Sequence, residues 1–237
     1  MAEHINTQFD VELEAIRSQV LGMAGLVEDQ VREAMRALAS GDAAVIQKVL
    51  DRETEVNDMH VKLDDMCVHM IARRQPAASD LRMVMTVIKS VEDLERVGDK
   101  AARICQRART IFESGRLQVP RFSELSHIAD LALAMLASSL DAFARRDALK
   151  AASVVRDDSR LDEEYRALQR QLITVMMEDP RTITLTLETQ SIAKAIERIG
   201  DYAVSIAKYT IYLVKGEDVR HRSLEAIELA AGTPRDE

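Results

Sequence analysis

Glu95-Arg96-Val97-Gly98-Asp99 and Glu197-Arg198-Ile199-Gly200-Asp201 are two copies of nearly the same pentamer, 102 positions apart. Apolar residues recur every three or four positions around both copies, which is typical of amphipathic helices. On a helix, residues four apart share a face, so each copy sets two carboxylates side by side. That arrangement costs roughly 0.2 to 0.5 kcal/mol through like-charge repulsion. The repeat therefore predicts a duplicated helical fold in which something compensates each acidic pair.

The composition favours helices around an aliphatic core. Aromatic residues make up 3% of the chain, and four prolines and eight glycines are too few for a turn-rich β protein. The prolines and several glycines mark where the periodic segments stop. Six helices are expected, at residues 5–39, 42–74, 77–113, 121–145, 147–178 and 181–215. Asp42, Asp147 and Asp179 are the expected N-terminal caps. The predicted fold class is all-α, with two tandem three-helix bundles of long antiparallel helices.

The predicted domains follow the repeat. Residues 1–115 form the first three-helix repeat, residues 116–216 the second, and residues 217–237 a C-terminal tail. The tail is expected to include a short helix from Ser223 to Ala231 and then to fray.

One segment conflicts with a helical interpretation, because polar and apolar residues alternate from Thr182 to Leu187 as they do in a strand. An isolated strand has no pairing partner in an all-helical repeat, and Ile183 and Leu187 keep the four-residue spacing of a helix face. We therefore predict a helix here.

Two hairpins bring further oxygen-bearing side chains to the pentamers. Helices that turn at Pro76 run antiparallel, so residues equally far before and after this proline lie at the same height, and the same holds at Pro180. The first predicted set is Glu53, Asn57, Glu95 and Asp99, and the second is Asp158, Asp162, Glu197 and Asp201. Such sets suit a cation that takes carboxylate ligands, such as Fe, Mn, Mg or Zn. Asn57 stands where symmetry predicts a carboxylate, which weakens the first site.

A solvated acidic face is the alternative interpretation. A single Glu-x-x-x-Asp on a helix is usually a surface row, stabilised by neighbours such as Glu92 with Arg96. Duplication copies an inert face as faithfully as a functional one. Gly98 and Gly200 favour crowding at this height, because a mid-helix glycine costs about 1 kcal/mol relative to alanine. The missing side chains leave room for an ion, its waters or a close helix.

Several classes of protein are disfavoured. A net charge of −8 argues against a nucleic-acid partner. Cys67 and Cys105 have no framework spacing and are expected to be reduced, packed thiols. Residues 1–10 lack the features of a secretory signal, and the most apolar stretch, 128–144, is interrupted by two aspartates. The protein is therefore expected in the cytoplasm, with only indirect membrane association.

No catalytic motif is apparent. The sequence lacks a glycine-rich phosphate loop, a nucleophile elbow and a Cys-x-x-Cys pair, so no catalytic residue is predicted. Glu124 and His127 match the Glu-x-x-His of di-iron bundles, but those proteins need two such motifs. His60, three residues after Asn57, is the other histidine of interest. A ferritin-like di-iron carboxylate oxidase and a structural helical bundle without metal remain as alternatives.

The segment from Ala72 to Arg82, followed by Asp93 to Asp99, resembles the PhoU family of phosphate-signalling proteins, and so does the two-repeat layout. The resemblance covers about residues 5 to 215. It implies a cytoplasmic, non-catalytic negative regulator of phosphate uptake and the phosphate-starvation response. Such a protein links the ATPase subunit of the phosphate ABC transporter to a sensor histidine kinase and forms a homodimer. The resemblance also implies multinuclear metal clusters on the two sets above, with Asn57 departing from the family pattern.

Overall fold

Six long helices and one short helix make up the protein, in a computed structural model that describes residues 2–115 and 121–232. The elements are α1 (Ala2–Ser40), α2 (Ala43–Arg74), α3 (Ala78–Glu113), α4 (Phe122–Arg145), α5 (Ala148–Glu178), the 3₁₀ turn η1 (Pro180–Thr182), α6 (Ile183–Lys215) and α7 (Leu224–Gly232). No strand occurs in the described ranges. The predicted all-α class is confirmed, and the predicted helix bounds differ from the observed ones by three residues at most.

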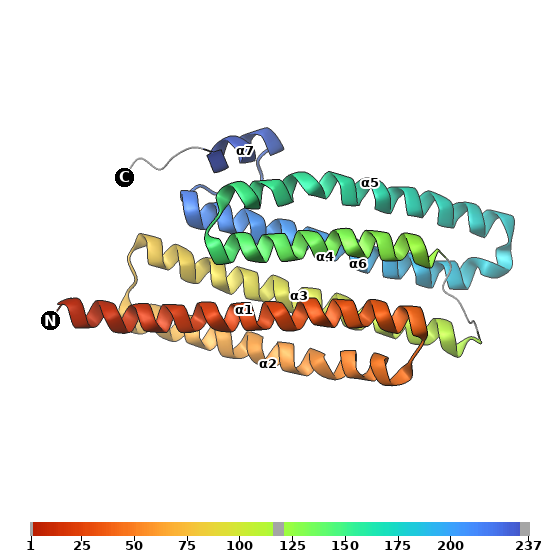
Figure 1. The fold of residues 1–237 in the computed structure, drawn as a ribbon, viewed down its shortest axis with the longest axis horizontal. Helices are drawn as coiled ribbons and strands as arrows, with labels where there is room; N and C mark the ends of the chain where they lie inside the picture. Colours follow the sequence, from red (N-terminus) through yellow and green to blue (C-terminus); the bar gives the residue numbers. More distant parts are fainter. Residues whose placement is uncertain (1, 116–120, 233–237) are drawn as a thin grey trace.

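The long helices lie nearly parallel to one another and give the molecule an elongated shape (Figure 1). Helices α1, α2 and α3 pack together, as do α4, α5 and α6, and the two groups meet chiefly where α3 packs against α6 (Figure 1). The buried apolar side chains form one continuous cluster with members from all seven α-helices. The two three-helix bundles thus share a single aliphatic core.

Aspartate caps begin three of the elements as the sequence predicts. Asp42 Oδ1 accepts a hydrogen bond from the backbone N–H of Ala44 (2.8 Å), and Asp147 Oδ1 accepts one from Lys150 (2.9 Å). Asp179 caps the η1 turn in the same way. Each cap satisfies a backbone donor that the first helical turn leaves without a partner.

The segment with strand-like alternation is helical, because α6 begins at Ile183 directly after η1. The helix prediction is therefore confirmed. Ile183 and Leu187 are 41% and 51% exposed, whereas Thr186 and Thr189 are fully buried. Ile183 and Leu187 do share a face, and that face points away from the core.

The predicted short helix in the tail is confirmed as α7, which packs on α5. Ile227 is buried in this contact, and Arg156 Nε donates to Glu228 Oε1 at 2.7 Å. The predicted fraying concerns residues 233–237, which lie outside the described residues.

Helix α4 is the one helix in the described ranges that is long and apolar enough to cross a membrane by length and composition. Half of its most apolar window is buried inside the protein. Leu125, Leu136 and Phe143 are among the largest fully buried side chains, so α4 serves as a core helix.

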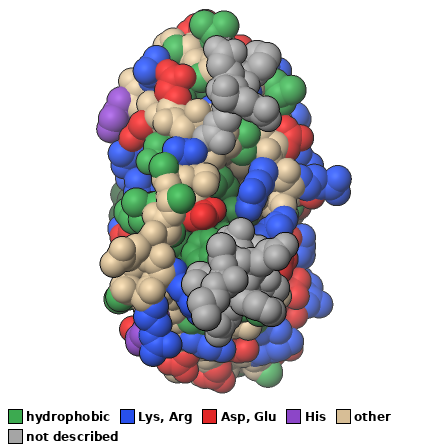
Figure 2. All heavy atoms as spheres, turned by 90° about the vertical axis from the view of Figure 1, so that its left-hand side faces the viewer, with side chains coloured by type: hydrophobic (Ala, Val, Ile, Leu, Met, Phe, Trp, Pro, Cys, Tyr) green, Lys and Arg blue, Asp and Glu red, His purple; other side chains and the backbone are tan. Residues whose placement is uncertain are grey.

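In the end-on view of Figure 2, acidic and basic side chains are interspersed over the visible face.

Both cysteines are free and buried, as predicted. Burial raises the pKa of the Cys67 and Cys105 thiols to about 12. Because the thiolate is the reactive form, neither thiol is a nucleophile near neutral pH.

Candidate metal centre

Within each hairpin, the two helices pack closely at the level of the mid-helix glycine. A Cβ on Gly98 would lie 3.4 Å from Val56 Cγ1 of α2, and a Cβ on Gly200 would overlap Leu161 Cδ2 of α5. Val56 directly precedes Asn57 in the chain, as Leu161 directly precedes Asp162. The helices therefore cross at the heights that counting from the prolines predicts.

A close neighbouring helix fills the space that each glycine leaves. Leu161 and Met135 occupy the room in front of Gly200, and Gln30 and Val56 occupy that in front of Gly98. The sequence left three explanations for these glycines open: room for an ion, for its waters, or for a close helix. The structure shows a close helix at both positions. The oxygen-bearing side chains flank these contacts.

In the second set, the four carboxylates repel one another. Burial, together with the negative charges of Asp201, Asp162 and Glu197, raises the pKa of Asp158 to about 6, although the charge of Lys208 lowers it. This coupling shows that the four groups lie near one another at the α5–α6 contact. It also shows that the folded protein tolerates their combined charge poorly.

Three of these carboxylates have a cation of their own. Each pairs with a Lys or Arg three or four residues away on the same helix. The pairs are Asp162 with Arg166 (2.7 Å), Glu197 with Lys194 (2.6 Å) and Asp201 with Arg198 (3.0 Å). The side chain of Asp158 has no hydrogen bond or ion pair within residues 2–115 and 121–232, which makes it the least compensated member.

Glu197 carries the clearest sign of an unmet interaction. Its side chain is 10% exposed, and Oε2 is buried with no hydrogen-bond partner in the described structure. A buried acceptor without a partner costs about 1 to 3 kcal/mol, and a bound cation would satisfy it. The all-oxygen donor set fits a hard or borderline divalent ion.

The side chains are not preassembled around a single point. Among the described residues, no group of three or more His, Cys, Asp or Glu side chains is arranged to hold a metal ion. Asp162 and Asp201 are turned toward Arg166 and Arg198 instead. Ion binding at this set would require those two side chains to leave their arginines.

The first set is less acidic. Burial raises the pKa of Glu95, and so does the neighbouring charge of Asp99, while His60 lowers it. His60 of α2 thus faces Glu95 across the hairpin. Asn57 is exposed and Glu53 is half-buried. The structure brings Glu95, Asp99 and His60 together.

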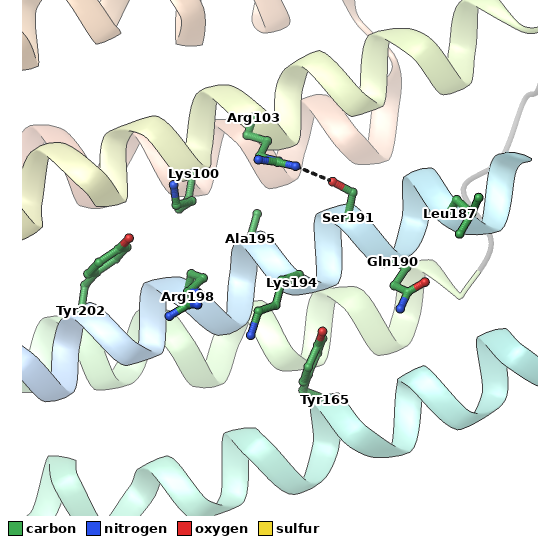
Figure 3. Close-up of a pocket in the computed structure, with 10 residues that line it drawn as sticks. All are labelled: Lys100, Arg103, Tyr165, Leu187, Gln190, Ser191, Lys194, Ala195, Arg198 and Tyr202. Atoms are coloured by element: carbon green, nitrogen blue, oxygen red, sulfur yellow. Dashed lines mark hydrogen bonds between the residues drawn. The ribbon is translucent and has the colours of Figure 1, made fainter.

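The structure also has a basic pocket between α3 and α6, which the sequence did not predict (Figure 3). Its cations include Lys100 and Arg103 of α3 and Lys194 and Arg198 of α6. In sequence these residues look like ordinary surface charges at helical spacing. Only the contact between the third helices of the two repeats assembles them.

Two three-helix repeats, each with an acidic pentamer in its third helix, define a class of duplicated helical-bundle proteins. The family model described as the PhoU domain matches the chain twice, at residues 20–108 and 125–210. These matches fall within α1–α3 and α4–α6. The chain belongs to the PhoU family.

Curated relatives align over almost the whole chain. A phosphate-specific transport system accessory protein PhoU homolog from Pseudomonas putida is 46% identical over 226 residues, covering 95% of this chain and 88% of the relative. The phosphate-specific transport system accessory protein PhoU of Escherichia coli K12 is 42% identical over 235 residues, covering 99% and 97%. Family members are accessory proteins rather than enzymes, and this protein is accordingly not an enzyme.

Solved structures of the family share the fold. The crystal structure of PhoU from Pseudomonas aeruginosa superimposes with a TM-score of 0.85 at 45% identity, covering 88% of this chain and all of that one. The phosphate transport system regulatory protein PhoU from Streptococcus pneumoniae gives 0.82 at 32% identity, covering 89% and 99%.

Proposed function

We propose that the protein is a cytoplasmic, metal-binding adaptor that restrains phosphate uptake and the phosphate-starvation response. In this role it docks, as a homodimer, on the ATPase subunit of the phosphate ABC transporter and on the sensor histidine kinase of the phosphate regulon. Its 42% identity to an accessory protein of the phosphate-specific transport system, over 99% of the chain, supports a place in that system.

The carboxylate set at the α5–α6 contact supports the metal-binding part of the proposal. The pKa of Asp158 is raised by three carboxylates close to it, those of Asp162, Glu197 and Asp201. In addition, Glu197 Oε2 lacks a hydrogen-bond partner among the described residues. Fe, Mn, Mg or Zn bound there would neutralise this repulsion and leave a fixed surface for a partner. The first set, with a neutral Asn57, binds more weakly.

Metal analysis of the purified full-length protein tests this step. The double variant Glu197→Ala, Asp201→Ala is expected to bind fewer ions than the wild type after chelator treatment and reloading with Mn²⁺ or Fe²⁺. The matched control is Asp157→Ala, Glu163→Ala, which removes two exposed carboxylates from α5. Equal metal content in the wild type and the Glu197, Asp201 variant would overturn the site.

A pull-down tests the adaptor role separately. The full chain is immobilised, and the kinase sensor region and the transporter ATPase are offered with and without metal. Retention of either partner, strengthened by metal, is the expected result. If neither partner is retained under any condition, the adaptor proposal is wrong even where metal binds.

The local ion pairs favour a second candidate, a structural bundle whose acidic rows are simply solvated. Asp162 and Asp201 already have cationic neighbours. For that candidate, the melting temperature would not change when metal or chelator is added, whereas a metal-binding protein is stabilised by its ligand. The di-iron oxidase alternative is not retained, since family members are not enzymes.

A further inference from the structure

The basic pocket lies where the third helices of the two repeats cross. Its volume is about 710 Å³, within the range of about 300 to 1,000 Å³ that is typical of small-molecule sites. In Figure 3, Lys100 and Arg103 extend from α3 toward α6, and Lys194 and Arg198 extend from α6. Four cations thus gather in one pocket of a chain whose net charge is −8.

Two of the four cations have no carboxylate partner. Within the described residues, Lys100 makes no hydrogen bond or ion pair, although its charge lowers the pKa of Glu95. In the described part of the chain, the one hydrogen bond of the Arg103 guanidinium goes to Ser191 Oγ, at 3.4 Å (Figure 3). The α3 wall therefore presents positive charge that a ligand can neutralise.

The other two cations, Lys194 and Arg198, each form an ion pair with a carboxylate on α6. Lys194 Nζ lies 2.6 Å from Glu197 Oε1, and Arg198 Nη1 lies 3.0 Å from Asp201 Oδ2. Lys194 also lies over the ring of Tyr165 of α5, 5.4 Å from its centroid. These contacts hold the α6 wall in place while its N–H donors remain partly exposed to the pocket.

The duplicated fold does not produce this pocket by itself. At the offset of 102 that relates the repeats, Glu92 and Asp93 of α3 correspond to Lys194 and Ala195 of α6. Asp93 is 4% exposed and lies 3.5 Å from Arg96. At this offset Arg198 corresponds to Arg96, whereas Lys100, Arg103 and Lys194 correspond to Tyr202, Ser205 and Glu92, so three of the four cations have no basic counterpart in the other repeat.

The chemistry of the lining indicates which ligand fits. Arg presents a planar fork of donors that matches phosphoryl oxygens, and Lys adds a point charge. A pocket of about 710 Å³ with cations on two helices has room for several linked phosphoryl groups that contact both walls at once. Ser191 and Gln190 add neutral hydrogen-bonding groups, and the ring of Tyr202 closes the end beyond Lys100 (Figure 3).

We propose that this pocket binds a small anion with two or more linked phosphoryl groups. The two sources of that chemistry are an inorganic polyphosphate and a nucleoside polyphosphate, and Tyr202 offers a stacking surface for the base of the latter. The site needs no metal, so the proposal goes beyond the proposed function and can fail independently of it.

Calorimetric titration of the full chain in chelator-treated, low-salt buffer tests the pocket with tripolyphosphate, ATP, orthophosphate and sulfate. Tripolyphosphate or ATP is expected to bind at least about tenfold more tightly than orthophosphate and sulfate, and to weaken as salt screens the charges. Tighter binding of ATP identifies a nucleotide source, and equal binding identifies the inorganic one. Failure of both polyphosphate probes to bind, or orthophosphate binding as tightly, overturns the proposal.

The double variant Lys100→Ala, Arg103→Ala tests whether the pocket itself is responsible. Both side chains lie at the surface of α3 and neither is in the core, so the variant is expected to fold, and its melting curve checks this. Polyphosphate affinity should fall at least about tenfold. Arg109→Ala is the matched control, because Arg109 lies on the same helix but bonds Gln47 of α2, outside the pocket. Equal weakening by the double variant and the control would refute the assignment.

Discussion

Replacing Asp158 with asparagine removes the charge that the α5–α6 contact accommodates least well. Burial and three neighbouring carboxylates raise the pKa of Asp158 from 3.8 to about 6. This difference corresponds to about 3 kcal/mol between the charged and neutral forms. Asp158 is only half-buried, and solvent screening reduces the effect to about 1 to 2 kcal/mol. Above pH 7, Asp158→Asn should therefore stabilise the metal-free protein by this amount, raising Tm by about 3 to 6 °C.

The sign of the effect depends on pH. Between pH 3.8 and about 6 the folded protein holds a proton on Asp158 that the unfolded chain has released. The wild type therefore loses stability from this group as pH rises through that window. The advantage of Asp158→Asn should be absent below pH 4 and complete above pH 7.

Thermal melting of chelator-treated protein at several pH values measures this effect. Asp157→Asn is the control, because Asp157 is the exposed neighbour of Asp158 on the same helix. The reasoning is refuted if Asp158→Asn leaves Tm unchanged or lowers it above pH 7. Where metal binds as proposed, added Mn²⁺ should stabilise the wild type more than the variant, because the variant has lost a ligand.

The glycines and the cysteines give two further predictions. Gly200→Ala should lower Tm more than Gly98→Ala, because the new Cβ overlaps the buried side chain of Leu161, and overpacking costs about 1 to 3 kcal/mol. Melting curves of the two variants decide this, and a Gly200→Ala variant as stable as the wild type would contradict it. Cys67 and Cys105, with pKa values of about 12, should resist a thiol reagent at pH 8 until denaturant is added. Rapid labelling of native protein would show that the thiols are accessible.

Much of the fold follows from local signals in the chain. Helix periodicity, the caps at Asp42 and Asp147, and the turns at Pro76 and Pro180 predict six helices whose bounds match the structure closely. These signals succeed because capping and periodicity depend on residues within one or two turns of each other. The exposure of Ile183 was not predictable, because spacing shows which residues share a face but not which face meets the core.

The candidate sites depend on the sequence to different degrees. The two sets of oxygen-bearing residues were predicted from hairpin symmetry, and the coupling of Asp158 to its neighbours is consistent with that symmetry. The orientation of those carboxylates was not predictable. Asp201 pairs with Arg198 on its own helix, since a cation three residues away competes with groups on the facing helix.

Sequence patterns within one or two helical turns determine the helical repeat and the cap positions. The positions of Pro76 and Pro180 determine the antiparallel register of each hairpin. The packing of α3 on α6 is set only in the tertiary structure, because it joins residues such as Arg103 and Ser191 that lie 88 positions apart. The basic pocket, the unpartnered oxygen of Glu197 and the filling of the space at Gly200 all depend on such distant contacts. Periodicity within one helix carries no information on which helix will face it, and so these features required coordinates.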